Sequence, residues 1–249
     1  MAEWFEDELF WESVYPVTFA AERFAVGADE AAEVLTLAGV ERGAVLDLCC
    51  GPARHAVPLA RRGFTVTAVD RSSFLLARAR ERAAEAGVEI EFVQDDMRRF
   101  VRPDAFDLAL NLFTSFGYLA SRGEDLAVLR RVHASLRSGG VLVMDLMGKE
   151  PLARQFEPTR SWVLADGTCL VERTRILDDW ARVRAEWIAI RDGRARTVAF
   201  TVTLYSGQEL RALLLEAGFA EVRLHGALDG RPYDQDAGRL VAVARKTVD

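Results

Sequence analysis

The sequence has 249 residues, half of them hydrophobic, and its 32 lysines and arginines against 38 acids give a net charge of −6. This length allows one substantial core, and the acidic pI near 5.3 argues against a broad nucleic-acid-binding surface. No apolar run approaches the ~20 residues that cross a membrane. Because the acidic start is unlike a secretory leader, we expect a cytoplasmic protein.

Aromatic residues are frequent in the first part of the chain, between positions 4 and 24. Aromatic side chains dominate burial energetics, so packing onto the core is the first interpretation of this stripe. The alternative is that some of these rings line a ligand site. We assign residues 1–28 to a helical segment outside the main domain, which then spans residues 29–249.

A strand, a tight turn, a helix start and a second strand follow at residues 45–70. Asp47 lies in the first strand, Gly51 lies in the turn, and Asp70 ends the second strand. The two acids are roughly 20 positions apart, the spacing that brings a second acid beside the same crevice. Such a unit binds a nucleoside, because the helix start offers free N–H groups and the acid accepts hydrogen bonds from a ribose. A dinucleotide is disfavoured, since only the first glycine of Gly-x-Gly-x-x-Gly is present.

This stretch resembles motif I of the class I S-adenosylmethionine-dependent methyltransferases, Asp/Glu-x-Gly-x-Gly-x-Gly. Asp47 matches the first acid and Gly51 the middle glycine, whereas Cys49 and Ala53 stand at the outer glycine positions. Both are small, but they tolerate positive φ less easily than glycine. The resemblance implies S-adenosyl-L-methionine as cofactor. The residues that it implies for cofactor binding in this part of the chain are Asp47, Cys49, Gly51, Arg54, His55, Asp70 and Arg71. For His55, local packing is an equally good interpretation.

The third strand is predicted at residues 89–93, and two acids follow it. At this place the resembled family commonly binds adenine with an acid and a neighbouring backbone N–H. We assign Asp96 to the exocyclic amine, with Asp95 as the alternative, and Met97 to packing on the ring. The competing interpretation is a solvated turn of acids and arginines.

The fourth strand, residues 106–111, opens into a loop at residues 112–118. The loop leaves the carboxyl end of its strand, where open α/β sheets bind ligands, so Asn111 and Phe113 are assigned to the cofactor site. Amide and adenine N-methyltransferases carry Asn/Asp-Pro-Pro-Tyr/Phe here, and this chain does not. The pattern is instead similar to bacterial small-molecule methyltransferases, including amino-sugar N,N-dimethyltransferases.

The remaining elements complete a Rossmann-like α/β fold. Helical spacing and terminal glycines predict helices at 53–62, 73–86, 124–137 and 207–218, and apolar runs predict strands at 140–146, 220–225 and 239–245. The resemblance implies a mostly parallel seven-stranded sheet whose last strand is antiparallel.

Residues 160–205 interrupt this order with alternating apolar and polar positions. Asp166-Gly167, Asp178-Asp179 and Asp192-Gly193 mark three turns, so we expect an antiparallel β insertion of about four strands that serves as a substrate-side subdomain. Its arginines alternate with acids. Ion pairing on a solvated face is therefore favoured over a basic platform for carboxylate, phosphate or RNA.

Methyl transfer needs little covalent chemistry from a protein, because the sulfonium donor is already activated; it needs an in-line acceptor and, for a protonated acceptor, a base. Tyr15 in the N-terminal segment and His225 at a late strand end are the candidate catalytic residues. No metal is expected, since no Cys/His spacing suits zinc. The three cysteines make no disulfide framework, and the adjacent Cys49 and Cys50 are interpreted as buried packing residues.

The function expected from these features is methyl transfer to the nitrogen or oxygen of a small-molecule acceptor. The N-terminal segment of related enzymes closes over the donor, so residues 1–28 are a candidate lid. The alternatives are an S-adenosylmethionine-binding regulatory or assembly protein and, less favoured, an RNA methyltransferase. Neither nucleic acid nor membrane is an expected partner, and a homodimer is left open.

Overall fold

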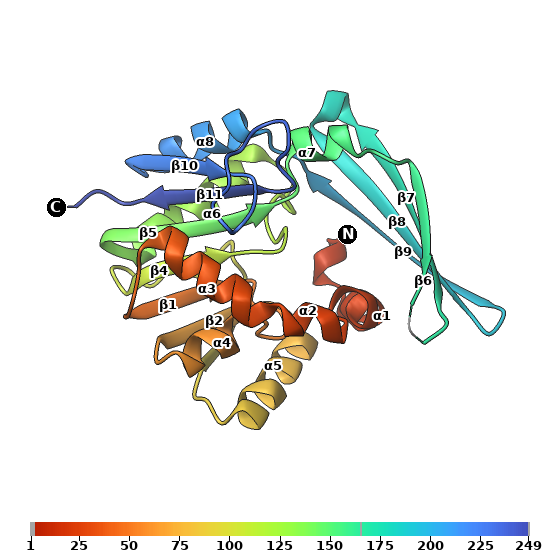
Figure 1. The fold of residues 1–249 in the computed structure, drawn as a ribbon, viewed down its shortest axis with the longest axis horizontal. Coiled ribbons are helices and arrows are strands. Elements are labelled where there is room, and N and C mark those ends of the chain that lie inside the picture. Colours follow the sequence, from red (N-terminus) through yellow and green to blue (C-terminus); the bar gives the residue numbers. More distant parts are fainter. Residues whose placement is uncertain (1–2, 165, 249) are drawn as a thin grey trace.

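The computed structural model describes residues 3–164 and 166–248, which form two β-sheets and flanking helices (Figure 1). The larger sheet, here called sheet A, has the strand order β10-β11-β5-β4-β1-β2-β3. Its strands are β1 Ala44–Leu48, β2 Thr65–Asp70, β3 Glu91–Gln94, β4 Phe106–Asn111, β5 Leu136–Leu146, β10 Glu221–His225 and β11 Leu240–Arg245. The last strand, β11, runs antiparallel to both β10 and β5, and the other strand pairs of this sheet are parallel, which confirms the predicted topology.

The helices are α1 Glu8–Thr18, α2 Ala21–Ala25, α3 Gly27–Ala38, α4 Ala56–Arg61, α5 Ser73–Ala86, α6 Arg122–Ser135, α7 Lys149–Arg154 and α8 Gly207–Glu216, with short 3-10 turns at Trp4–Glu6 and Asp178–Trp180. The largest differences from the predicted boundaries are at the starts of α4 and β5. Helix α4 begins at Ala56 rather than residue 53, because the turn before it extends through His55. Strand β5 begins at Leu136, directly after α6, with a register irregularity opposite Phe106–Leu108.

The core lies on both faces of sheet A, because successive side chains of its central strands point to opposite sides. Leu46 and Ala109 pack in the cluster with residues of α6 and α8. Val45 and Leu108 pack in the cluster with residues of α3, α4 and α5. Each fully buried leucine contributes about 1.5–3 kcal/mol. This rigid core fixes the carboxyl edge of the sheet, where the predicted site residues lie.

The insertion forms a second, antiparallel sheet, here called sheet B, of β6 Thr159–Val163, β7 Cys169–Leu177, β8 Arg182–Arg191 and β9 Arg194–Thr203. The four strands and the three turns agree with the sequence prediction. Arg173 pairs with Glu186, and Arg191 pairs with Asp166, as the alternation of charges predicted. The third cross-strand pair, Arg160 with Glu172, lies on the face that turns toward sheet A.

The N-terminal segment lies between the two sheets (Figure 1). Trp4 contacts both sides: its ring centroid is 4.7 Å from that of Tyr118, in the loop after β4, and 5.3 Å from that of Phe200 on β9. Its indole Nε1 donates to the carbonyl of Thr201 at 3.2 Å. None of the helices in residues 3–164 and 166–248 is long and apolar enough to cross a bilayer.

Candidate active site

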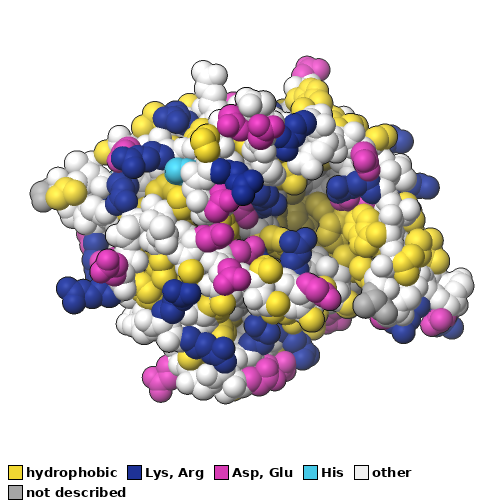
Figure 2. Space-filling view, viewed as in Figure 1, with side chains coloured by type: hydrophobic (Ala, Val, Ile, Leu, Met, Phe, Trp, Pro, Cys, Tyr) yellow, Lys and Arg dark blue, Asp and Glu magenta, His cyan; other side chains and the backbone are white. Residues whose placement is uncertain are grey.

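A cavity of about 530 Å³ lies where the carboxyl edge of sheet A, the N-terminal segment and sheet B meet. On the face drawn in Figure 2, a hollow with hydrophobic side chains is visible between the main body and sheet B. One part of the cavity wall consists of predicted cofactor residues, namely Cys49, Gly51, Asp70, Arg71, Asp95, Asp96, Met97 and Phe113. The other part is largely aromatic and includes Trp4, Phe10, Trp11, Tyr118, Trp162, Trp187 and Phe200.

The turn after β1 has left-handed backbone conformations at the three positions of the glycine pattern, although two of these positions are not glycine. Cys49, Gly51 and Ala53 have φ values of 62°, 53° and 61°. A left-handed conformation costs a non-glycine residue about 1–2 kcal/mol. Ala53 is fully buried, so surrounding packing imposes this conformation. A Cβ on Gly51 would lie 3.3 Å from the Phe19 ring, which shows how closely the N-terminal segment approaches this turn.

Asp70 is fixed at the end of β2 by two backbone groups. Its Oδ2 accepts from Gly51 N at 2.8 Å and its Oδ1 accepts from Ser72 N at 2.9 Å. Burial raises the pKa of this carboxyl to about 6, although both hydrogen bonds act in the opposite direction. Each oxygen still has acceptor capacity, so the group can bind two hydroxyls of a ribose.

Asp47 and Asn111 lie buried beneath the turn rather than in the cavity wall. Asn111 Nδ2 donates to the carbonyls of Leu48 at 3.3 Å and Ser115 at 3.4 Å. Asp47 Oδ2 and Asn111 Oδ1 have no hydrogen-bond partner among the described residues. An unsatisfied buried acceptor costs about 1–3 kcal/mol. Both atoms are buried beneath the turn and neither reaches the cavity in this structure, so the cofactor contacts expected of these two residues stay predictions.

Arg54 and His55 turn away from the cavity and contact Glu30 of α3. Arg54 forms an ion pair with Glu30, and His55 Nε2 lies 2.9 Å from the same carboxylate. Both residues are nearly inaccessible and neither lines the cavity. The direct cofactor contacts predicted for them are therefore not visible in this geometry, and the local-packing interpretation of His55 describes what is present.

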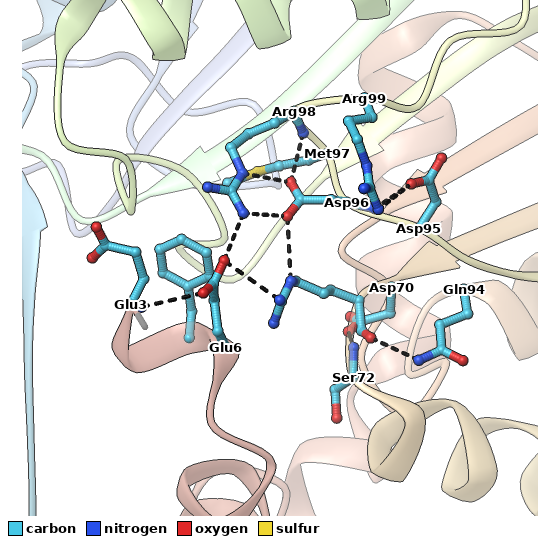
Figure 3. Close-up of polar contacts among 12 residues, drawn as sticks. Glu3, Glu6, Asp70, Ser72, Gln94, Asp95, Asp96, Met97, Arg98 and Arg99 are labelled. Carbon is cyan, nitrogen blue, oxygen red and sulfur yellow. Dashed lines mark hydrogen bonds and ion pairs between the residues drawn. The ribbon is translucent and has the colours of Figure 1, made fainter. Parts of the chain in front are cut away.

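The acids after β3 are engaged by arginines (Figure 3). Asp96 accepts from Arg98 Nε at 3.0 Å and Nη2 at 2.6 Å, and Arg71 Nε lies 3.3 Å away. Burial opposes ionisation of Asp96, but these arginines outweigh it and lower its pKa. Asp95 accepts from the Asp96 backbone N at 2.7 Å and from Arg99 at 3.2 Å. Both acids and Met97 line the cavity, so the choice between Asp95 and Asp96 for an adenine remains a prediction.

The loop after β4 carries Phe113 into the cavity wall. Phe113 and Thr114 have φ values of 59° and 60°. The Thr114 backbone N–H donates to the backbone carbonyl of Asp145 at the end of β5, and the Phe113 N–H donates to the Asp145 carboxylate. Arg239 reaches the same carboxylate at 2.7 and 2.8 Å. The guanidinium carbon of Arg54 lies 4.7 Å from the centroid of the Phe113 ring. These contacts fix the ring next to the turn that contains Gly51.

The two candidate catalytic residues lie outside the cavity wall. The Tyr15 ring packs against Phe19 and Phe74, at centroid distances of 5.5 and 5.4 Å. His225 ends the edge strand β10, where its Nδ1 lies 3.0 Å from the carbonyl oxygen of Gly230. Neither position supports contact with a reacting atom.

Four charged residues of the wall were not predicted from the sequence: Arg23, Arg160, Glu172 and Arg239. The alternation in the insertion placed Glu172 on one face of a strand, but which face meets the cavity depends on packing against the N-terminal segment. Trp187 lies directly opposite Glu172 on β8, and its Nε1 donates to Glu172 Oε1 at 3.0 Å.

Comparison with known proteins agrees with this geometry. Residues 45–140 match the family model described as a methyltransferase domain. The crystal structure of S-adenosylmethionine-bound CalS10, an amino pentose methyltransferase from Micromonospora echinaspora, superimposes with a TM-score of 0.71 at 25% identity, over 95% of this chain and 96% of that one. Residues 45–140 thus match a methyltransferase domain, and the sheet around them has the fold of a known methyltransferase.

Among curated relatives, this chain is 31% identical to the putative methyltransferase YqeM of Bacillus subtilis over 117 residues, 47% of each chain. The glycine/sarcosine N-methyltransferase of Aphanothece halophytica is 25% identical over 83% of this chain and 78% of the relative. The chain spans about half or less of the first curated relatives, 47% of YqeM and 41% of a Geobacillus protein.

S-adenosyl-L-methionine is the methyl donor of this family, and the residues present fit it. The paired oxygens of Asp70 suit its ribose, and Asp95, Asp96 and Met97 in the same wall suit its adenine. The apolar side chains of Leu48, Val69 and Leu75 complete the wall on this side of the cavity.

Proposed function

We propose that this methyltransferase domain transfers a methyl group from S-adenosyl-L-methionine to a small-molecule acceptor, with an amine nitrogen as the nucleophile. One observation carries the proposal: a single cavity joins the predicted cofactor residues to the aromatic compartment under sheet B. Two relatives that match most of the chain, an amino pentose methyltransferase and a glycine/sarcosine N-methyltransferase, support an amine acceptor. An oxygen nucleophile is the alternative.

The chain's own residues would bind and orient the reactants. Asp70 binds the ribose, Asp95 or Asp96 binds the adenine edge, and Met97 packs on its ring. The donor, when bound, supplies a sulfonium-activated methyl group. The aromatic compartment excludes water and keeps the acceptor in line with that group, which is the main requirement of a displacement reaction. An amine must reach the methyl carbon in its neutral form, since a protonated nitrogen has no lone pair.

The experiment combines donor binding with turnover. S-adenosylhomocysteine binding is measured by calorimetry, and radiolabelled S-adenosylmethionine is offered with a library of small amines, alcohols and acids. We expect binding by the unmodified protein and label transfer to at least one amine, with both reduced in Asp70→Asn. Tight binding without transfer to any compound would favour the regulatory alternative. Strongly salt-dependent binding of bulk RNA would favour the nucleic-acid alternative.

A further inference from the structure

Glu172 places a carboxylate inside the aromatic compartment. It lies on the cavity-facing side of β7, and its side chain is 12% exposed. Trp187 Nε1 donates to its Oε1 at 3.0 Å, and Arg160 forms an ion pair with its Oε2. Burying a carboxylate is costly unless charged or hydrogen-bonding partners compensate. An apolar side chain could occupy position 172 as far as the alternation of the strand is concerned, yet the residue there is a glutamate.

The rings around Glu172 form a continuous cluster. The centroids of Trp187 and Phe200 are 5.4 Å apart, those of Phe200 and Trp4 5.3 Å, and those of Trp4 and Tyr118 4.7 Å. The indole N–H groups of Trp4 and Trp187 both donate to protein oxygens. The compartment therefore offers a ligand mainly ring faces, which carry negative charge density and attract cations.

The compensating arginine lies at the rim. The Arg160 side chain is 51% exposed, so solvent screens its charge, whereas Glu172 lies deeper. The other basic residues of the wall belong to the cofactor side, where Arg71 contacts Asp96 and Arg239 contacts Asp145. Inside the aromatic compartment, the carboxylate and the ring faces thus make a negative environment.

We propose that Glu172, together with the rings of Trp187 and Phe200, binds a positively charged group of the acceptor, a protonated amine above all. Glu172 is then a specificity-determining residue of sheet B. The proposal rests on the proposed function for the identity of the ligand as an acceptor. A nitrogen bound there as a cation has no lone pair, so this contact recognises and orients the acceptor and does not itself activate the nucleophile.

Three ring compounds of matched shape test the charge preference: cyclohexylammonium, cyclohexanol and cyclohexanecarboxylate. Their binding to the S-adenosylhomocysteine-saturated protein is followed by tryptophan fluorescence and by ligand-observed NMR. We expect the ammonium compound to bind about tenfold or more tightly than the alcohol, and the carboxylate more weakly still. Glu172→Gln, whose amide oxygen still accepts from Trp187, should reduce this preference about tenfold. Phe200→Leu should weaken ammonium binding more than alcohol binding.

Glu186→Gln is the matched control. Glu186 lies on β8 of the same sheet, does not line the cavity, and contacts Arg173 at 3.5 Å, so the variant makes the same change of charge outside the compartment. It should keep the full preference. Equal binding of the three probes, preference for the carboxylate, no saturable binding of the ammonium compound, or an unchanged preference in Glu172→Gln would each overturn the proposal. Failure of the proposed function would instead appear as absent S-adenosylhomocysteine binding or absent turnover, which are measured separately.

Discussion

Glu8 and Ser72 join the N-terminal segment to the core, with Glu8 Oε2 accepting from Ser72 Oγ at 2.6 Å. The same carboxylate accepts from the backbone N–H groups of Ser73 at 2.9 Å and Phe74 at 3.2 Å. These are free N–H groups at the start of α5, where the helix dipole favours a negative charge. The contact also lies two residues after Asp70, so α1 is anchored beside the proposed ribose site.

Removing this anchor should loosen the N-terminal segment, the candidate lid. In Glu8→Ala the three hydrogen bonds to the start of α5 are lost, and we expect S-adenosylhomocysteine to dissociate roughly tenfold faster, since bonds to a charged group contribute about 1.5–3 kcal/mol and this one is partly solvated. Stopped-flow displacement measures the rate, and hydrogen exchange of α1 should rise in parallel. Glu12→Ala, on an exposed position of α1, is the control and should leave both unchanged. Equal rates in the two variants would contradict an anchoring role.

Donor binding should depend on pH through Asp70. Its pKa in the folded chain is about 6 against an ordinary 3.8, so the carboxylate becomes protonated as the pH falls through about 6. Since the ribose hydroxyls donate to the ionised form, S-adenosylhomocysteine affinity should fall up to tenfold per pH unit below that point. Calorimetry between pH 5 and 8 measures it, and Asp70→Asn should give a weaker, flatter profile.

Unfolding can be separated from this loss of binding. A carboxyl whose folded pKa is raised takes up more protons in the folded state than in the unfolded state between about 4 and 6, so its own contribution to the free energy of unfolding rises as the pH falls. As the pH falls, protonation of Asp70 should therefore weaken donor binding while its contribution to the free energy of unfolding increases. A flat affinity profile in the unmodified protein would refute the assigned role of Asp70.

Cys49 and Cys50 should be poorly reactive in the folded protein. Burial raises the pKa of both thiols well above the ordinary value of 9.0, and the neighbouring Asp70 acts in the same direction. We expect a thiol reagent at pH 8 to label Cys169 first, Cys49 more slowly because its pKa is raised although it lines the cavity, and buried Cys50 only on unfolding. Mass spectrometry of labelled peptides measures the order, and donor binding should be the same with and without reductant. A disulfide between Cys49 and Cys50 that reversibly abolishes binding would restore a redox interpretation.

Ala53→Gly should stabilise the protein. The left-handed conformation at Ala53 costs about 1–2 kcal/mol, whereas glycine adds about 0.5–1 kcal/mol of unfolded-state entropy, so the net gain is up to about 1 kcal/mol and a few degrees in Tm. Thermal unfolding measures it. Ala79→Gly, inside α5, should destabilise by about 1 kcal/mol or more. A lower Tm in Ala53→Gly would show that the lost methyl packing matters more than the dihedral angle.

Much of the fold is visible in the sequence because its signals are local. The signals are an apolar strand that contains Asp47, a second that ends on Asp70, glycines that end helices, and the Asp-Gly turns of sheet B, and each acts within a few residues. The exact start of β5 was not predictable, since the bulge opposite Phe106–Leu108 depends on pairing with β4.

The site was only partly predictable, because long-range contacts determine it. Nothing near Asp96 in the sequence signals that Arg71 approaches it, and nothing near Glu8 signals Ser72. For Glu172, a shift of one residue in strand register would exchange the cavity face for the solvent face, and only the observed pairing with Trp187 decides between them.

The turn at residues 49–53 also bears on how such domains are recognised. What the ligand requires there is a backbone path with three left-handed residues, and this chain achieves it with one glycine, one cysteine and one alanine. A sequence pattern that requires glycine at these positions detects the residue that adopts left-handed φ most easily, but it does not detect the backbone conformation itself. Sequences that substitute small buried side chains would be discarded by such a pattern, although a comparison of dihedral angles would group them together with their glycine-rich counterparts.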